Sequence, residues 1–167
     1  SEATTITTSA GHPVALRTTD MDGDGDLDVV SAARSMGRIE WFEKPDETGG
    51  WIRRVITEEV EAPYSIHFAD INGDGLEDLL SASRFDNKVS WYERLPVAGF
   101  ASQQIITNQA GGAASVHAGD LDGDGDLDVL AAAIDDDSIT WHENRPCDVS
   151  YFCADVVAGN SFDPQGA

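Results

Sequence analysis

Apolar and polar residues alternate over short stretches of the chain, which is the pattern of half-buried β-strands. Segments 65–70 (SIHFAD) and 88–93 (KVSWYE) show this period of two, and short apolar runs such as 78–83 (DLLSAS) and 103–107 (QQIIT) are typical of buried strands. Clusters of Gly, Pro, Asn and Asp interrupt the pattern at short intervals, and no stretch of ten or more residues carries an apolar stripe with the helical period. The pattern therefore predicts an all-β protein.

The predicted strands recur with a period of 50 residues. Segment 20–30 reads DMDGDGDLDVV, segment 70–80 reads DINGDGLEDLL and segment 120–130 reads DLDGDGDLDVL, with no insertion between copies. About four strands in one such unit suit the blade of a β-propeller. We therefore predict three propeller-type blades of about four antiparallel strands each within residues 1–145, as a partial propeller or an open repeat array, and a C-terminal cap with an extra strand at residues 146–167.

The repeat contains one strand more than three blades need, because Ile6, Ile56, Ile106 and Val156 are related by the same step of 50. An unpaired terminal strand invites pairing with another chain. Propellers close with about four to eight blades, so three are too few for a ring. Two alternatives remain: the chain forms a homo-oligomer or filament head to tail through its terminal strands, or its blades are a fragment of a larger propeller.

Oxygen-bearing side chains recur at relative positions 1, 3, 5 and 9 of three acidic loops. Alternate positions of a tight loop can converge on one centre, and the glycines between them permit the backbone angles required. Position 7 varies in side chain, which suits a ligand supplied by the backbone carbonyl. The predicted metal ligands are Asp20, Asp22, Asp24, Asp26 and Asp28; Asp70, Asn72, Asp74, Leu76 and Asp78; and Asp120, Asp122, Asp124, Asp126 and Asp128.

Calcium is the metal that these loops favour, since Ca²⁺ accepts six to eight oxygens in flexible geometry whereas Mg²⁺ requires a stricter octahedron. Position 12 holds Ser31, Ser81 or Ala131 instead of the bidentate Glu of helix-flanked calcium loops, and strand-like sequence follows. We therefore predict three strand–loop–strand Ca²⁺ sites. The alternative is a set of solvated Asp-Gly turns, which would not need four oxygen donors at fixed spacing three times. Without an ion the carboxylates repel each other, so we expect Ca²⁺ binding to be coupled to folding.

These D-x-D-G-D-G-x-x-D loops, together with the Trp strands that follow them, resemble the FG-GAP and VCBS-type repeats over roughly residues 3–145. The resemblance implies β-propeller blades, calcium held in a loop between adjacent strands, and a secreted or cell-surface protein. Members of this family include adhesion-receptor head domains, lectin-like proteins and some extracellular lyases. Asn72 departs mildly from the commonest loop and lowers the charge of the middle site without removing an oxygen donor.

The net charge narrows the choice of partners. Of 167 residues, 31 are Asp or Glu and 10 are Lys or Arg, which gives a formal charge of −21. This charge repels phosphate backbones and anionic lipids, so we expect no binding to nucleic acid. No apolar run of membrane-spanning length occurs, so we also expect no membrane insertion. The start at Ser1 lacks the features of a signal peptide, which predicts a soluble mature chain or an excised piece.

The two cysteines, Cys147 and Cys153, lie six positions apart beside Pro146. We predict a small disulfide-closed loop in an oxidising compartment, with two free thiols as the alternative. Zinc is not expected, because two thiolates without a nearby His pair fall short of four ligands.

The remaining chemistry-bearing residues point to a non-enzymatic module. Trp41, Trp91 and Trp141 occupy the same place in every repeat, which favours packing between blades over stacking on a sugar. Trp51 has no counterpart and is the freer aromatic, and the sequence shows no nucleophile elbow, phosphate loop or zinc signature. We therefore expect an extracellular, calcium-stabilised structural or adhesive module, with glycans or extracellular proteins as further partners. A lectin-like propeller module and a fragment of a propeller enzyme acting on sugars are the alternatives.

Overall fold

The computed structural model describes residues 3–44, 50–97 and 99–144. This part of the chain forms eleven strands in three antiparallel sheets, which we call blades. Blade 1 comprises β1 (Pro13–Thr19), β2 (Asp28–Ala33), β3 (Arg38–Glu43) and β4 (Ile52–Thr57). Blade 2 comprises β5 (Pro63–Ala69), β6 (Asp78–Ser83), β7 (Lys88–Tyr92) and β8 (Gln104–Thr107). Blade 3 comprises β9 (Ala113–Gly119), β10 (Asp128–Ala133) and β11 (Ser138–His142).

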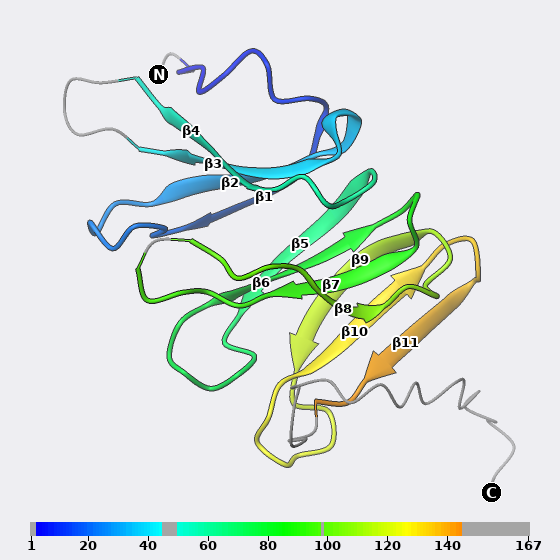
Figure 1. The fold of residues 1–167 in the computed structure, drawn as a ribbon. Helices are drawn as coiled ribbons and strands as arrows, with labels where there is room; N and C mark the ends of the chain where they lie inside the picture. Colours follow the sequence, from blue (N-terminus) through cyan, green and yellow to red (C-terminus); the bar gives the residue numbers. More distant parts are fainter. Residues whose placement is uncertain (1–2, 45–49, 98, 145–167) are drawn as a thin grey trace, which may run out of the picture.

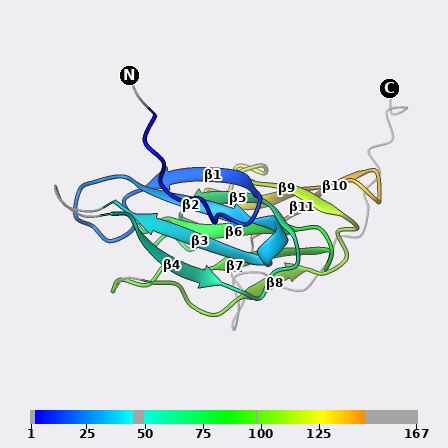
Figure 2. The same ribbon diagram turned by 90° about the horizontal axis from the view of Figure 1, so that it is seen from above.

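Each blade is an up-and-down meander in which consecutive strands are neighbours. The blades stack face to face in chain order, with blade 2 between the other two (Figures 1 and 2). The helical content of the described residues is one 3₁₀ turn, η1 (Arg34–Met36), between β2 and β3. No helix among them has the length and hydropathy needed to cross a membrane. The prediction of an all-β protein with three propeller-type blades is confirmed.

Strand register repeats along with the sequence. The second strand of each blade pairs with the third in the same way, so that Trp41 lies opposite Val30, Trp91 opposite Leu80 and Trp141 opposite Leu130. The first and second strands are joined by the acidic loop, whose residues leave the sheet after Thr19, Ala69 and Gly119. The 50-residue period is therefore a period of structure, and it places each acidic loop at the same corner of its blade.

Two apolar clusters hold the blades together. One lies between blades 1 and 2 and includes Ile39, Trp41, Ile66, Leu79 and Tyr92. The other lies between blades 2 and 3 and includes the counterparts of Ile39 and Trp41 one repeat later. Packing between blades is thus the role of the first two repeat tryptophans, as their place in the sequence predicts. The third, Trp141, is 43% exposed, because no described sheet covers that face of blade 3.

The sequence predicts the surplus strand at either the N-terminal or the C-terminal end of the repeats, and the structure describes only the N-terminal segment. Residues 3–12 contain no strand, so the segment around Ile6 is not a fourth strand here. The segment around Val156 and the rest of the cap lie outside the described residues, as do Cys147 and Cys153 with their predicted disulfide. Among the described strands, β11 is consequently the outer edge of blade 3.

Candidate metal sites in the acidic loops

The three acidic loops join the first two strands of each blade and lie at the same end of their respective blades (Figure 1). Their first carboxylate shapes the turn, because the two oxygens of Asp20 accept the backbone N–H groups of Gly23 and Gly25 at 2.7 and 3.0 Å. Both glycines have positive φ, 82° and 92°, in open space, so the turn needs glycine for its backbone angles. In the third loop, Asp120 accepts from Gly123 and Gly125 in the same way.

The first and third loops each gather three carboxylates. One oxygen from each of Asp20, Asp22 and Asp24 lies within 4.8 Å of the others, and the oxygens of Asp120, Asp122 and Asp124 meet the same limit. Asp22 and Asp24 also accept backbone N–H groups two residues ahead, at 3.2 and 2.7 Å, which fixes their orientation. Three negative charges at this spacing repel one another, and hard oxygen donors are the ligands that Ca²⁺ takes. The donor set therefore fits a divalent cation at both loops.

The middle loop replaces one carboxylate with an amide. The Nδ2 of Asn72 donates to Oδ2 of Asp74 at 3.3 Å and to Oε1 of Glu93 at 3.4 Å. Its Oδ1 accepts the N–H of Asp74 at 3.1 Å, as a carboxylate oxygen does in the other loops. The amide thus keeps an oxygen donor and contacts two neighbouring carboxylates, so this loop carries less repulsion of its own.

The last acidic residue of each loop has a structural role that the spacing did not reveal. Asp28 is 1% exposed, and its two oxygens accept the N–H groups of Met21 at 3.0 Å and Lys44 at 2.7 Å. Asp78 and Asp128 make the same pair of bonds one and two repeats later. Burial raises the pKa of Asp28 and of Asp78, while the backbone donors oppose this rise. These three residues tie the start of the loop to the end of the third strand, and their role as metal ligands stays a prediction.

Position 7 differs among the loops, as the sequence shows. The side chain of Asp26 forms an ion pair with Lys44 at 2.7 Å, and the Leu76 side chain offers no oxygen. The N–H groups at this position bind the carboxylate at position 5, at 2.7 Å in the first loop and 2.9 Å from Asp126 to Asp124 in the third. A metal ligand from the backbone carbonyl of these residues stays a prediction.

A glutamate beside each loop was not among the predicted ligands. Glu93 accepts from Asn72. Desolvation and the charges of Asp124 and Asp128 raise the pKa of Asp122, and the charge of Glu143 adds a smaller contribution. Glu43 is instead paired with Arg54 at 2.6 Å. The signal for these residues was in the sequence, because Glu43, Glu93 and Glu143 recur with the Trp strand at the 50-residue step.

Three of the histidines have described neighbours in blades 2 and 3. His67 and His117 lie side by side across the boundary between blades 2 and 3, with ring centroids 4.2 Å apart. Burial lowers the pKa of His67, and the charges of His117 and Arg17 lower it further. His142 shares a hydrogen bond of 3.0 Å with Thr140, and burial lowers its pKa. Trp51, the aromatic favoured by a lectin interpretation, is half-buried next to the start of β4.

Stacked antiparallel blades, each with an acidic loop between its first two strands, define a β-propeller-type repeat protein with loops suited to a divalent cation. The chain belongs to the family of FG-GAP-like repeats. The model of that family matches residues 20–81 and again residues 70–131, so the two matches together cover more than half of the chain. No curated protein matches it.

Proposed function

We propose that this chain is an extracellular, calcium-stabilised structural or adhesive module without catalytic activity, which assembles head to tail with further copies through its terminal strands. The observation that carries this proposal is the recurrence of a three-carboxylate cluster at the same corner of blades 1 and 3. Such a cluster is costly without a cation and cohesive with one. Asp20, Asp22 and Asp24 would hold the first ion, Asp120, Asp122 and Asp124 the third, and Asp70, Asn72 and Asp74 the second.

The loops are joined directly to the contacts between blades. Met21 follows the ligand Asp20, is 2% exposed and packs in the cluster between blades 1 and 2. Its N–H is held by Asp28, and its carbonyl accepts from the guanidinium of Arg94 in blade 2. A cation that fixes the first loop therefore also fixes a residue of the blade interface. In this proposal calcium acts as a structural cross-link, which suits a protein whose function is mechanical.

An extracellular setting is supported by the family and by calcium chemistry. FG-GAP-like repeats are typical of extracellular proteins, and this chain belongs to that family. Calcium modules outside the cell bind with dissociation constants of about 10⁻⁴ to 10⁻³ M, which matches loops that are open to solvent and hold few ligands. The loop carboxylates are mostly exposed, as such sites require.

The test is the solution mass of the chain, measured by light scattering in Ca²⁺ and then in a chelator. We expect assemblies larger than 17.8 kDa in Ca²⁺ that dissociate or unfold when the chelator is added. Asp124→Ala should weaken this response, whereas Glu58→Ala, an exposed change away from the loops, should not. A folded monomer of unchanged stability in both conditions would contradict the calcium coupling and the assembly together.

A further inference from the structure

Blade 3 exposes the sheet face that blades 1 and 2 bury against the blade that follows them. Three positions of this face show the difference most clearly, one in the acidic loop and two on the third strand. They are Met21, Ile39 and Trp41 in blade 1, with 2, 0 and 8% exposed; Ile71, Val89 and Trp91 in blade 2, with 3, 0 and 0% exposed; and Leu121, Ile139 and Trp141 in blade 3, with 44, 80 and 43% exposed. Equivalent apolar residues are thus buried in blades 1 and 2 and exposed in blade 3. An exposed apolar surface of this kind marks an interaction site.

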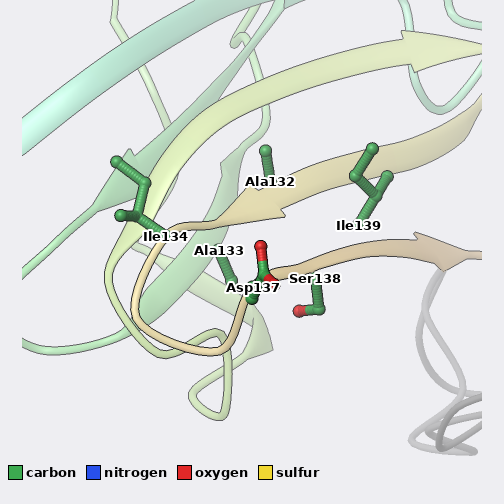
Figure 3. A pocket seen from close by; sticks show the side chains of 6 residues that line it. All are labelled: Ala132, Ala133, Ile134, Asp137, Ser138 and Ile139. Atoms are coloured by element: carbon green, nitrogen blue, oxygen red, sulfur yellow. The ribbon is translucent and has the colours of Figure 1, made fainter.

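The side chains of this face project together. Figure 3 shows Ala132 and Ile139 on one side of β10 and β11, at the edge of a shallow hollow. The counterparts of Ala132 in the other blades, Ala32 and Ala82, are fully buried in the two interblade clusters. We call the surface formed by Leu121, Ala132, Ile139 and Trp141 the tail face.

Polar contacts between blades also repeat, and the sequence continues their pattern at both ends of the stack. Arg94 of blade 2 donates to the carbonyl of Met21, and Asn144 of blade 3 donates to the carbonyl of Ile71 at 2.9 Å. One repeat earlier, the donor position is Lys44 of blade 1, and one repeat later the acceptor is the carbonyl of Leu121. The Lys44 side chain is 44% exposed and pairs with Asp26 of its own blade at 2.7 Å, at the position from which Arg94 and Asn144 contact the preceding blade.

Blade 1 presents the opposite face. Leu16 on β1 is 56% exposed, whereas Ile66 and Val116, which occupy the same position in blades 2 and 3, are 0 and 3% exposed against the preceding blade. Beside it, the buried Glu40 is neutralised by Arg38 and Arg53, at 2.8 and 2.6 Å. We call this surface, centred on Leu16, the head face.

Charge distinguishes the two ends of the stack. Six of the ten Lys and Arg residues lie between residues 13 and 57, in blade 1, and none lies between residues 113 and 144. Each of these two segments contains nine Asp and Glu residues, so their formal charges are −3 and −9. A contact between the blade 1 end of one copy and the blade 3 end of another is therefore less repulsive than a contact between two blade 3 ends. Charge thus favours the head face over a second tail face as the partner of blade 3.

We infer that the tail face of one copy packs against the head face of a second copy, in the arrangement that adjacent blades adopt within the chain. The inference rests on the proposed self-assembly and gives it a face-to-face contact in addition to pairing of terminal strands. The contact is heterologous, so its repetition produces a ring or a filament. Two copies would supply six blades, which is within the range of about four to eight at which propellers close.

The test uses one variant of each face and their mixture, in Ca²⁺, by sedimentation velocity. Ile139→Asp places a negative charge on the tail face, and Leu16→Asp places one on the head face. Val97→Asp, at a position that is 86% exposed and belongs to neither face, is the control. We expect the wild type and the control to assemble and each face variant alone to be monomeric. Mixing the two variants should restore a 1:1 dimer, because each variant retains the face that the other lacks.

Other results would overturn the inference in distinguishable ways. If Ile139→Asp alone prevented assembly and Leu16→Asp did not, tail would pack on tail. If the wild type assembled and neither variant changed its mass, terminal strands alone would carry the assembly and the proposed function would stand without this contact. A wild type that remained monomeric at every concentration would overturn both the face contact and the self-assembly. Calcium-coupled folding is tested separately, by whether the chain unfolds in chelator.

Discussion

Replacing Asp22 with asparagine should change the stability of the protein in opposite directions with and without Ca²⁺. The oxygens of Asp20, Asp22 and Asp24 lie within 4.8 Å of one another, so the charge of Asp22 is repelled by two neighbours. The middle loop already contains asparagine at this position, and there its amide accepts from Asp74 and donates to Asp74 and Glu93. The substitution therefore reproduces an arrangement that the same backbone accommodates one repeat later.

The size of both effects follows from this geometry. Two unit charges about 5 Å apart repel by about 0.8 kcal/mol in water, and salt reduces this at an exposed site. Removing one charge with two neighbours should raise the free energy of unfolding in chelator by roughly 0.5–1 kcal/mol. With Ca²⁺ present the lost carboxylate should weaken binding at least tenfold, which removes about 1.4 kcal/mol or more of ligand stabilisation. The loss in Ca²⁺ is then larger than the gain.

The assay is urea unfolding followed by tryptophan fluorescence, in excess Ca²⁺ and in chelator. The expected result for Asp22→Asn is a higher midpoint in chelator and a lower midpoint in Ca²⁺ than the wild type has. Glu58→Gln, which removes one exposed negative charge away from the loops, controls for net charge and should shift both midpoints equally. A shift of the same sign in both conditions for Asp22→Asn would refute the cation site at this loop.

Three further outcomes follow from burial and hydrogen bonding. Trp91→Ala should cost about 3–5 kcal/mol of unfolding free energy in denaturant titrations, because Trp91 is fully buried, whereas Trp141→Ala should cost far less in a monomer. Asp78→Ala should cost roughly 2–6 kcal/mol, measured in the same way, because it leaves the N–H groups of two loop-anchoring residues without their acceptor. Since the folded state lowers the pKa of His67 below its ordinary value of 6.5, stability should fall as the pH drops below 6.5, and His67→Asn should flatten this decline in thermal melts recorded against pH.

The repeat made much of the fold predictable. An unbroken 50-residue step requires that equivalent residues occupy equivalent positions, and the strands, loops and first two tryptophans follow that rule. Trp141 departs from it, although its sequence context is the same. Burial of this side chain depends on a neighbouring sheet, which a residue's own repeat does not encode.

The acidic loops show a second limit of sequence reasoning. Spacing predicts that Asp28 lies among oxygen donors, yet the partners that fix it are the N–H groups of Met21 and Lys44. Lys44 is 16 residues away along the chain and reaches the loop only because β2 and β3 pair. Hydrogen-bond partners of a buried carboxylate are set by the tertiary fold, so motif spacing could not reveal this anchoring role. The structure separates a buried residue that anchors the loop from the more exposed carboxylates beside it, and the predicted ligand role of Asp28 stays a prediction.

That separation explains how a site on the surface can control contacts inside. Asp78 anchors both Ile71, whose carbonyl accepts from Asn144 of blade 3, and Arg94, whose guanidinium binds blade 1. One buried carboxylate thus connects the loop of blade 2 to both neighbouring blades. A cation bound at the exposed positions, as we propose, would restrain the same loop, and its effect would reach both interfaces through these hydrogen bonds. In a row of blades that contact only their neighbours, binding at each loop would then stabilise the whole row.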